Sequence, residues 1–149
     1  GPLLRWARRR LHRLRIWLAG HGKHARGLAF HRAAKNLLIQ GGDPNSKSND
    51  RDSWGMGDEK LEKVNAEFSD RPFVKGSLGA ARGFDPNGAS TQFFICAGPY
   101  PSWTGQYTNY GQVIAGQEVV QAIASAPTDN QDRLKTKVVL KKVYLEKSK

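Results

Sequence analysis

Three side chains that donate hydrogen bonds stand inside segments that otherwise look ready to be buried. In FHRAAKNLLIQGGDPN, Arg32 and Gln40 flank an apolar run, and in FDPNGASTQFFICAGP, Gln92 precedes two phenylalanines. Alternate residues of a strand share a face, so Gln92 and Phe94 point the same way and the small, apolar Cys96 follows them. The pattern predicts a patch that is half polar and half apolar. The plainer interpretation places Phe94 in the core and Gln92 at the surface.

Other chemistries find little support in the sequence. The stretches GGDPNSK and GMGDEK fit neither the Walker nor the dinucleotide-binding spacing, and no Gly-x-Ser-x-Gly elbow occurs. Cys96 is the only cysteine, which excludes an intrachain disulfide, and its apolar strand pattern favours an inert buried thiol. All four histidines lie in the first 31 residues, and the His21-x-x-His24 pair has no nearby carboxylate. We therefore expect no metal site.

The elements that must position these side chains are mostly β-strands. From Ala29 onward, short apolar runs alternate with clusters of Gly, Pro, Asn and Asp, which is typical of closely spaced strands. The runs are LLIQ, FVKGSLGAA, TQFFICAG, YGQVIAG and KVVLKKVYLEK. In QEVVQAIASA, by contrast, Val119, Val120 and Ile123 mark one face of a short helix that ends before Pro127. A chain of 149 residues fits one domain, and we predict a mainly β, antiparallel barrel or sandwich with one late helix.

The positive charge of the chain is concentrated at its N-terminal end. Residues 1–42 carry ten of the 24 Lys and Arg residues and no Asp or Glu, whereas the remainder is nearly neutral. Residues 3–19, LLRWARRRLHRLRIWLA, contain good helix formers and no internal Gly or Pro, which predicts a helix. Such a helix fits an anionic membrane surface, a mitochondrial-type presequence or a nucleic-acid arm. A solvated basic helix or a disordered tail is the interpretation that we favour.

The motifs, taken in order, resemble those of a known family. The blocks FHR, IQGGDPN, GSLGAAR, STQFFIC and GQYTNYGQVIAGQEVVQAI are similar to cyclophilin-type peptidyl-prolyl cis-trans isomerases, and most of all to their short bacterial-type members. The resemblance runs from about Gly27 to Lys147. It implies a closed eight-stranded antiparallel β-barrel capped by two helices, with a groove on the outer face. It also implies an isomerase, or rotamase, that accelerates rotation about X–Pro bonds in protein folding without a cofactor.

The resemblance also assigns roles to individual residues. The catalytic arginine of the family falls on Arg32, the glutamines that grip the substrate backbone fall on Gln40 and Gln92, and the phenylalanine at the base of the proline pocket falls on Phe94. The remaining substrate-binding positions line the groove or the rim of the pocket. They fall on Leu37, Leu38, Ala81, Arg82, Trp103 and Tyr107.

The chain departs from the family at several of these positions. Leu37 and Leu38 stand where Phe-Met is usual, which keeps the pocket apolar but offers less flat surface to a proline ring. We therefore expect weaker turnover, and a proline-peptide binding module with little turnover is an alternative function. Arg82 stands where asparagine is common, and Trp103 stands where leucine is usual.

The family's first two strands and first helix are not recognisable in residues 1–26. We therefore divide the chain into a basic, atypical segment (1–26) and a cyclophilin-like isomerase domain (27–149); a natural replacement or a shifted reading frame would explain the first. A barrel without two strands would expose edges and part of its core.

The expected partners are proline-containing peptides, unfolded proteins and a cyclosporin-type ligand, with nucleic acid or membrane only through the basic segment. We expect a monomer, and a cytoplasmic location by default.

Overall fold

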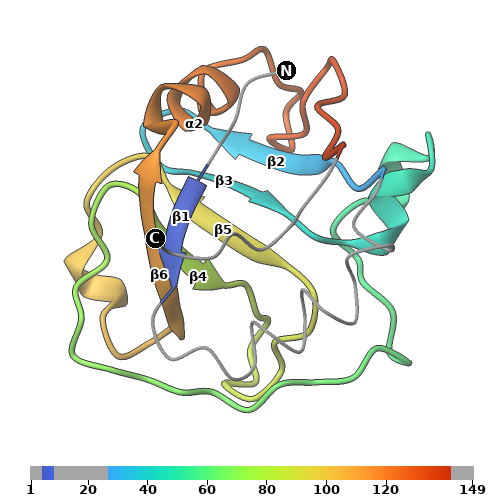
Figure 1. Cartoon of the computed structure of the whole chain (residues 1–149). Helices are drawn as coiled ribbons and strands as arrows, with labels where there is room; N and C mark the ends of the chain where they lie inside the picture. Colours follow the sequence, from blue (N-terminus) through green and yellow to red (C-terminus); the bar gives the residue numbers. More distant parts are fainter. Residues whose placement is uncertain (1–4, 9–26, 142–149) are drawn as a thin grey trace.

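The computed structural model describes residues 5–8 and 27–141, with side chains from residue 27 onward. Its strands are β1 (Arg5–Arg8), β2 (Phe30–Ala34), β3 (Leu38–Gly41), β4 (Ser77–Ala80), β5 (Phe93–Cys96) and β6 (Asn109–Ala115) (Figure 1). Its helices are the α-helix α2 (Gln117–Ala124) and three short 3₁₀ helices, η1 (Pro44–Lys47), η2 (Arg51–Ser53) and η3 (Pro101–Trp103). No helix within these described ranges is long and apolar enough to cross a membrane.

The strands form one antiparallel sheet in the order β1-β6-β4-β5-β3-β2, and α2 follows β6 (Figure 1). The predicted mainly β fold with one late helix is thereby confirmed. The sheet has six strands in the described residues and its two end strands, β1 and β2, do not pair, so the closed eight-stranded barrel is not complete there. Residues 138–140 run along the outer side of β2 instead. Phe30 N donates to Val138 O at 3.1 Å, and Leu140 N donates to Leu28 O at 2.7 Å.

The N-terminal segment corrects one prediction. Arg5–Arg8 form a strand that pairs antiparallel with β6, so the helix predicted for residues 3–19 is wrong at these four residues. Helix propensities differ by less than about 1 kcal/mol per residue among ordinary residues, and backbone pairing with a distant strand outweighs them. The rest of the basic segment lies outside the described residues. Its predicted helix, its nucleic-acid or membrane role and the domain division at residue 27 therefore stay predictions.

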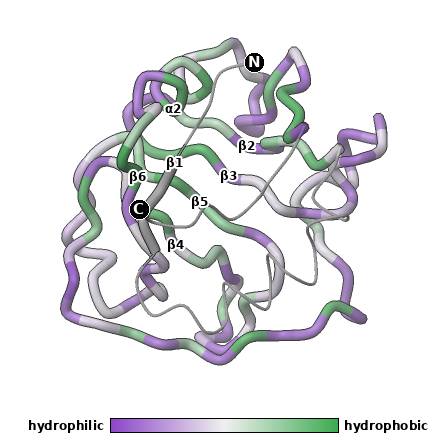
Figure 2. The backbone as a smooth tube through the Cα atoms, viewed as in Figure 1, coloured by the Kyte–Doolittle hydropathy of each residue, from purple (hydrophilic) through white to green (hydrophobic). Residues whose placement is uncertain are grey.

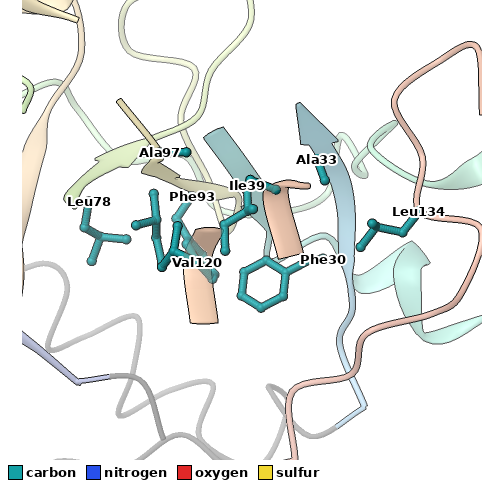
Figure 3. Packing of buried hydrophobic residues seen from close by; sticks show 10 residues of the cluster. Phe30, Ala33, Ile39, Leu78, Phe93, Ala97, Val120 and Leu134 are labelled. Carbon is teal, nitrogen blue, oxygen red and sulfur yellow. The ribbon is translucent and has the colours of Figure 1, made fainter. Parts of the chain in front are cut away.

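One face of the sheet packs against α2 and forms what we call the inner core (Figure 3). Its ten buried residues are Phe30, Ala33, Ile39, Leu78, Phe93, Ile95, Ala97, Val120, Ala124 and Leu134. In Figure 2, hydrophobic colour gathers in β3, β5 and α2, while the long connection between β3 and β4 is largely hydrophilic. Val120, on the predicted apolar face of the helix, is fully buried. Alternate residues of β3 and β5 point the other way and form the candidate site.

Candidate active site

A single row of paired residues crosses four strands and carries both the polar and the apolar parts of the predicted site. Arg32 on β2 pairs with Gln40 on β3, and Gln40 pairs with Phe94 on β5. Gly79 on β4 completes the row opposite Phe94. Residues that pair directly across an antiparallel sheet point to the same face, on strands about 4.8 Å apart. The register therefore sets a guanidinium, an amide and a ring side by side on the face away from the inner core.

A β-bulge in β2 turns Arg32 to that face. Phe30 pairs with Gly41 and Arg32 with Gln40, so His31 is an extra residue on β2. In a regular strand without a bulge, Phe30 and Arg32 are two residues apart and would share a face. With it, Phe30 packs in the inner core and Arg32 lines the opposite side of the sheet. A bulge commonly re-aims a side chain in this way next to a functional site.

The polar side chains form a directed chain of hydrogen bonds. Arg32 Nη1 donates to Gln40 Oε1 at 3.5 Å, Gln40 Nε2 donates to Gln92 Oε1 at 3.0 Å, and Gln92 Nε2 donates to Gly55 O at 3.1 Å. The two amides therefore hold each other in one orientation. Within the described residues, the guanidinium of Arg32 donates no other hydrogen bond, so most of its five N–H groups remain for a ligand.

The loop that ends this chain is itself anchored by a buried carboxylate. Asp43, fully buried after β3, accepts hydrogen bonds from Asn45 N and Gly57 N, both at 3.1 Å. These bonds hold the backbone around Gly55 against Gln92. The long loop between β3 and β4 thus supports the site with its backbone.

Aromatic side chains form the apolar half of the site. We call the following residues the groove cluster: Leu38, Phe73, Phe94 and Cys96, with Leu37, Ala81, Tyr100, Trp103 and Tyr107 packed on them. Phe94 stacks on Phe73 with ring centroids 5.6 Å apart, and it meets Trp103 and Tyr107 edge to face at 5.4 and 5.6 Å. Edge-to-face contacts of this kind stabilise aromatic pairs and fix the ring planes.

The hairpin between β2 and β3 places Leu37 at the edge of this cluster. Leu37 N donates to Ala34 O at 3.0 Å, and Asn36 adopts the left-handed conformation with φ 61°, which asparagine tolerates better than most residues. Tyr100 Oη donates to Asn36 O at 2.6 Å and fastens the turn to the opposite side of the groove. The tight turn therefore fixes the position of Leu37.

The polar row and the groove cluster meet in one open cavity of about 160 Å³. Its lining residues are Arg32, Leu37, Leu38, Gln40, Ala81, Arg82, Phe94, Trp103 and Tyr107. These are nine of the ten site residues predicted from the sequence. The tenth, Gln92, does not line the cavity and reaches it through the amide of Gln40. The structure brings the predicted residues together; their roles in binding and catalysis stay predictions.

Two titratable side chains lie buried behind the cavity. Burial lowers the pKa of His31, and the charge of Arg32 acts in the same direction, whereas Asp43 and a hydrogen bond with Gln92 oppose the shift. Burial raises the pKa of Cys96 to about 12, which fits the inert thiol expected from the sequence. Among the described residues, no group of three or more His, Cys, Asp or Glu side chains is placed to hold a metal ion.

Sequence reasoning missed the residues that support the site from behind. Phe73 is the first residue of the strand-like run FVKGSLGAA, and nothing in its neighbourhood indicates that its ring stacks on Phe94. Gly79 is one of 16 glycines, and only the cross-strand register shows that it faces Phe94. The bulge at His31 depends on pairing with β3, which no local pattern specifies.

Comparisons with known proteins show which family the chain is similar to. Residues 16–145 match the sequence model of the cyclophilin type peptidyl-prolyl cis-trans isomerase family. A probable peptidyl-prolyl cis-trans isomerase of Brucella abortus is 40% identical over 101 residues, which cover 65% of this chain and 52% of the relative. The chain thus spans about half the length of the first curated relatives that it matches. The peptidyl-prolyl cis-trans isomerase CYP18-2 of Arabidopsis thaliana is 36% identical over 117 residues, covering 74% of this chain and 69% of the relative.

A solved structure extends the likeness to the fold. The cyclophilin type peptidyl-prolyl cis-trans isomerase of Cryptosporidium parvum, solved in the presence of the dipeptide Ala-Pro, superposes with a TM-score of 0.83. It is 22% identical in sequence, and the superposition covers 97% of this chain and 93% of that one. The antiparallel sheet with a helix packed on one face is therefore a cyclophilin fold. The chain belongs to the cyclophilin-type peptidyl-prolyl cis-trans isomerase family.

Proposed function

We propose that this chain is a peptidyl-prolyl cis-trans isomerase that binds an X–Pro segment in the cavity between Arg32 and Phe94. One observation carries the proposal: an arginine with unused donors and a buried phenylalanine ring lie in the same cross-strand row and line the same cavity. The Cryptosporidium parvum relative was solved in the presence of an Ala-Pro dipeptide, which supports a proline-containing ligand.

The reaction requires no bond to be broken. Rotation about the X–Pro bond faces a barrier of about 18–20 kcal/mol, because amide resonance is lost in the twisted state. In that state the prolyl nitrogen becomes pyramidal and regains a lone pair. A catalyst must therefore bind the twisted amide more tightly than either planar form.

Arg32 suits this task in our proposal. Its guanidinium is always charged and its planar N–H groups are rigid, so it donates to the prolyl nitrogen only when the lone pair is available. The neighbouring groove cluster removes water and strengthens that interaction. The hydrogen bond from Arg32 to Gln40 limits the side chain's freedom before the peptide arrives.

The aromatic pocket and the glutamines bind different parts of the substrate. Phe94, which is only 3% exposed, forms the floor on which the proline ring rests. Gln40 faces the cavity and is held by Gln92, so it binds the peptide backbone on one side of the rotating bond. Holding one side still while the other turns is the positional contribution to catalysis.

An isomerisation assay on an Ala-Pro peptide tests the proposal. We expect Arg32→Ala to lower kcat/KM by about 10²–10³-fold, the range for removal of one preorganised donor to a transition state. Arg32→Lys keeps the charge but lacks the planar guanidinium, so its kcat/KM should lie between those of the parent and of Arg32→Ala. Arg71→Ala is the matched control, because Arg71 is exposed and does not line the cavity. Equal activity of parent and Arg32→Ala would overturn the proposal.

The same assay separates isomerase from binding module. Leu37 gives the proline ring a smaller flat surface than phenylalanine would. A parent chain that binds the peptide, observed through the fluorescence of Trp103 in the cavity, but does not accelerate isomerisation would support the binding module. Acceleration by the parent would support the enzyme.

A further inference from the structure

A second arginine lies at the cavity, at a position where the family commonly has asparagine. Arg82 follows β4 and Ala81, whose N–H donates to Gln92 O at 3.0 Å. Both Ala81 and Arg82 line the cavity. The chain therefore places two cations on one groove, and no Asp or Glu is among the lining residues.

The guanidinium of Arg82 is held in place on the rim. Its Nε and Nη2 donate to Gln106 O at 3.1 and 2.7 Å, and its Nη1 donates to Gly83 O at 3.0 Å. Its Cζ lies 4.8 Å from the centre of the Tyr107 ring. The side chain thus joins the loop after β4 to the loop before β6. Fixing it in advance lowers the entropy that a ligand must remove on binding.

No carboxylate neutralises this charge in the described residues. The hydrogen-bond partners of Arg82 are backbone carbonyls, which are neutral. Asp85, the nearest carboxylate in sequence, accepts from Asn87 N at 2.9 Å instead. The ion pairs of the described part of the chain join Arg133 to Asp52 and Asp129. The rim at Arg82 therefore carries a fixed, unbalanced positive charge.

We propose that Arg82 gives the groove a preference for X–Pro segments that carry an acidic side chain next to the proline. The inference rests on the proposed isomerase function. A glutamate on a residue flanking the bound proline meets the exposed guanidinium, and a lysine meets like charge. Opposite charges at a partly exposed site change binding by modest factors, and such pairs set specificity more than affinity. We expect a Glu-containing peptide to have a kcat/KM about three- to tenfold above its Ala counterpart, and a Lys-containing peptide to fall below it.

Exchange NMR on short peptides tests the preference without a coupled protease. Peptides with Glu, Ala or Lys before proline, and a second set with the same residues after it, are compared at low and high salt. The Glu/Ala ratio is formed within each protein variant, so a general change in activity cancels. In Arg82→Asn and Arg82→Gln we expect the ratio to fall to about one, and high salt should lower it in the parent. Arg71→Asn, at an exposed site away from the cavity, should keep the ratio of the parent.

Each outcome decides one question. Acceleration of the Glu, Ala and Lys peptides to the same degree in both sets overturns the inference about Arg82 and leaves the proposed isomerase function intact. A Glu preference that persists in Arg82→Asn also overturns it. Failure to accelerate any peptide overturns the proposed isomerase function instead. If a variant loses turnover, the ratio of peptide Kd values from Trp103 fluorescence replaces the kinetic ratio, and an unchanged ratio contradicts the inference.

Discussion

The two faces of the same sheet differ in their residue types and in how far they are open to solvent. The inner core lies between one face of the sheet and α2, and its strand residues are mainly aliphatic. The groove cluster is mainly aromatic and opens into a cavity beside Arg32 and Arg82. Neighbouring residues of β5 serve both, since Ile95 faces the core and Phe94 faces the groove. Strand alternation therefore separates the inner core from the candidate site within the four residues of β5.

A substitution that creates a cavity in the inner core should lower stability most and leave the groove unchanged. Ile95 is fully buried in the inner core. We expect Ile95→Ala to lower the free energy of unfolding by about 2–5 kcal/mol, because the transfer energy is lost and a cavity remains. Activity per folded molecule should stay within about twofold, because surface and core changes away from the reacting groups leave transition-state contacts unchanged.

Denaturant unfolding with activity normalised to the folded fraction measures both quantities. Ile114→Ala is the matched control, because Ile114 is 59% exposed and its loss should cost less than about 0.5 kcal/mol. A large loss of activity per folded Ile95→Ala molecule would show that the two faces are not independent.

Overpacking on the groove face should affect stability and activity together. A Cβ at Gly79 would lie 2.3 Å from Phe94 Cζ and 2.8 Å from Phe73 Cε1. Gly79→Ala must therefore displace the ring, and we expect a loss of about 1–3 kcal/mol in unfolding free energy together with lower kcat/KM. Gly83→Ala is the control, because a Cβ there meets no atom within 4 Å. Equal behaviour of the two variants would contradict the role of Gly79 in seating Phe94.

The contrast between the faces also explains what the sequence could and could not predict. The inner and outer sides of β5 follow from alternation, and the motif blocks identified the residues that line the cavity. The support behind them depends on pairings between distant segments. Phe73 on Phe94, Gly55 on Gln92 and β1 on β6 join residues that no local pattern relates. Backbone pairing also overrode the helical tendency of Arg5–Arg8, because propensity is a weak preference beside tertiary structure.

A larger side chain at the edge of the groove cluster should raise kcat/KM and change the stability of the inner core little. Leu37 is half-buried at the cavity edge and packs on the groove cluster. We expect Leu37→Phe to raise kcat/KM on an Ala-Pro peptide about two- to fivefold, because a flat ring gains contact area with proline. The matched variant Leu38→Phe changes a buried residue and should lose stability through overpacking. Unchanged or lower activity of Leu37→Phe would count against the hypothesis that Leu37 weakens turnover.

The smallest effect should come from His31, a buried histidine close to Arg32 and Gln92. His31 is the bulged residue of β2, and burial is the main cause of its lowered pKa, with Arg32 adding to it and Asp43 and Gln92 opposing it. Above the unfolded pKa of 6.5 the residue is neutral in both states and costs nothing. As the pH falls below that value, the unfolded chain binds a proton that the folded chain does not, so the free energy of unfolding falls and levels off below the folded pKa.

Unfolding measured from pH 7.5 to 5 in the parent and in His31→Gln isolates this contribution, because the difference between the two curves removes every other titrating group. We expect the difference to change below pH 6.5 and to be flat above it. The hydrogen bond with Gln92 favours the protonated imidazole, so protonated His31 should compete with Gln40 for the Gln92 amide oxygen, and kcat/KM should fall in the same pH range in the parent alone. If kcat/KM of His31→Gln falls in the same way, the pH dependence belongs to another group, and protonation of His31 does not affect the groove.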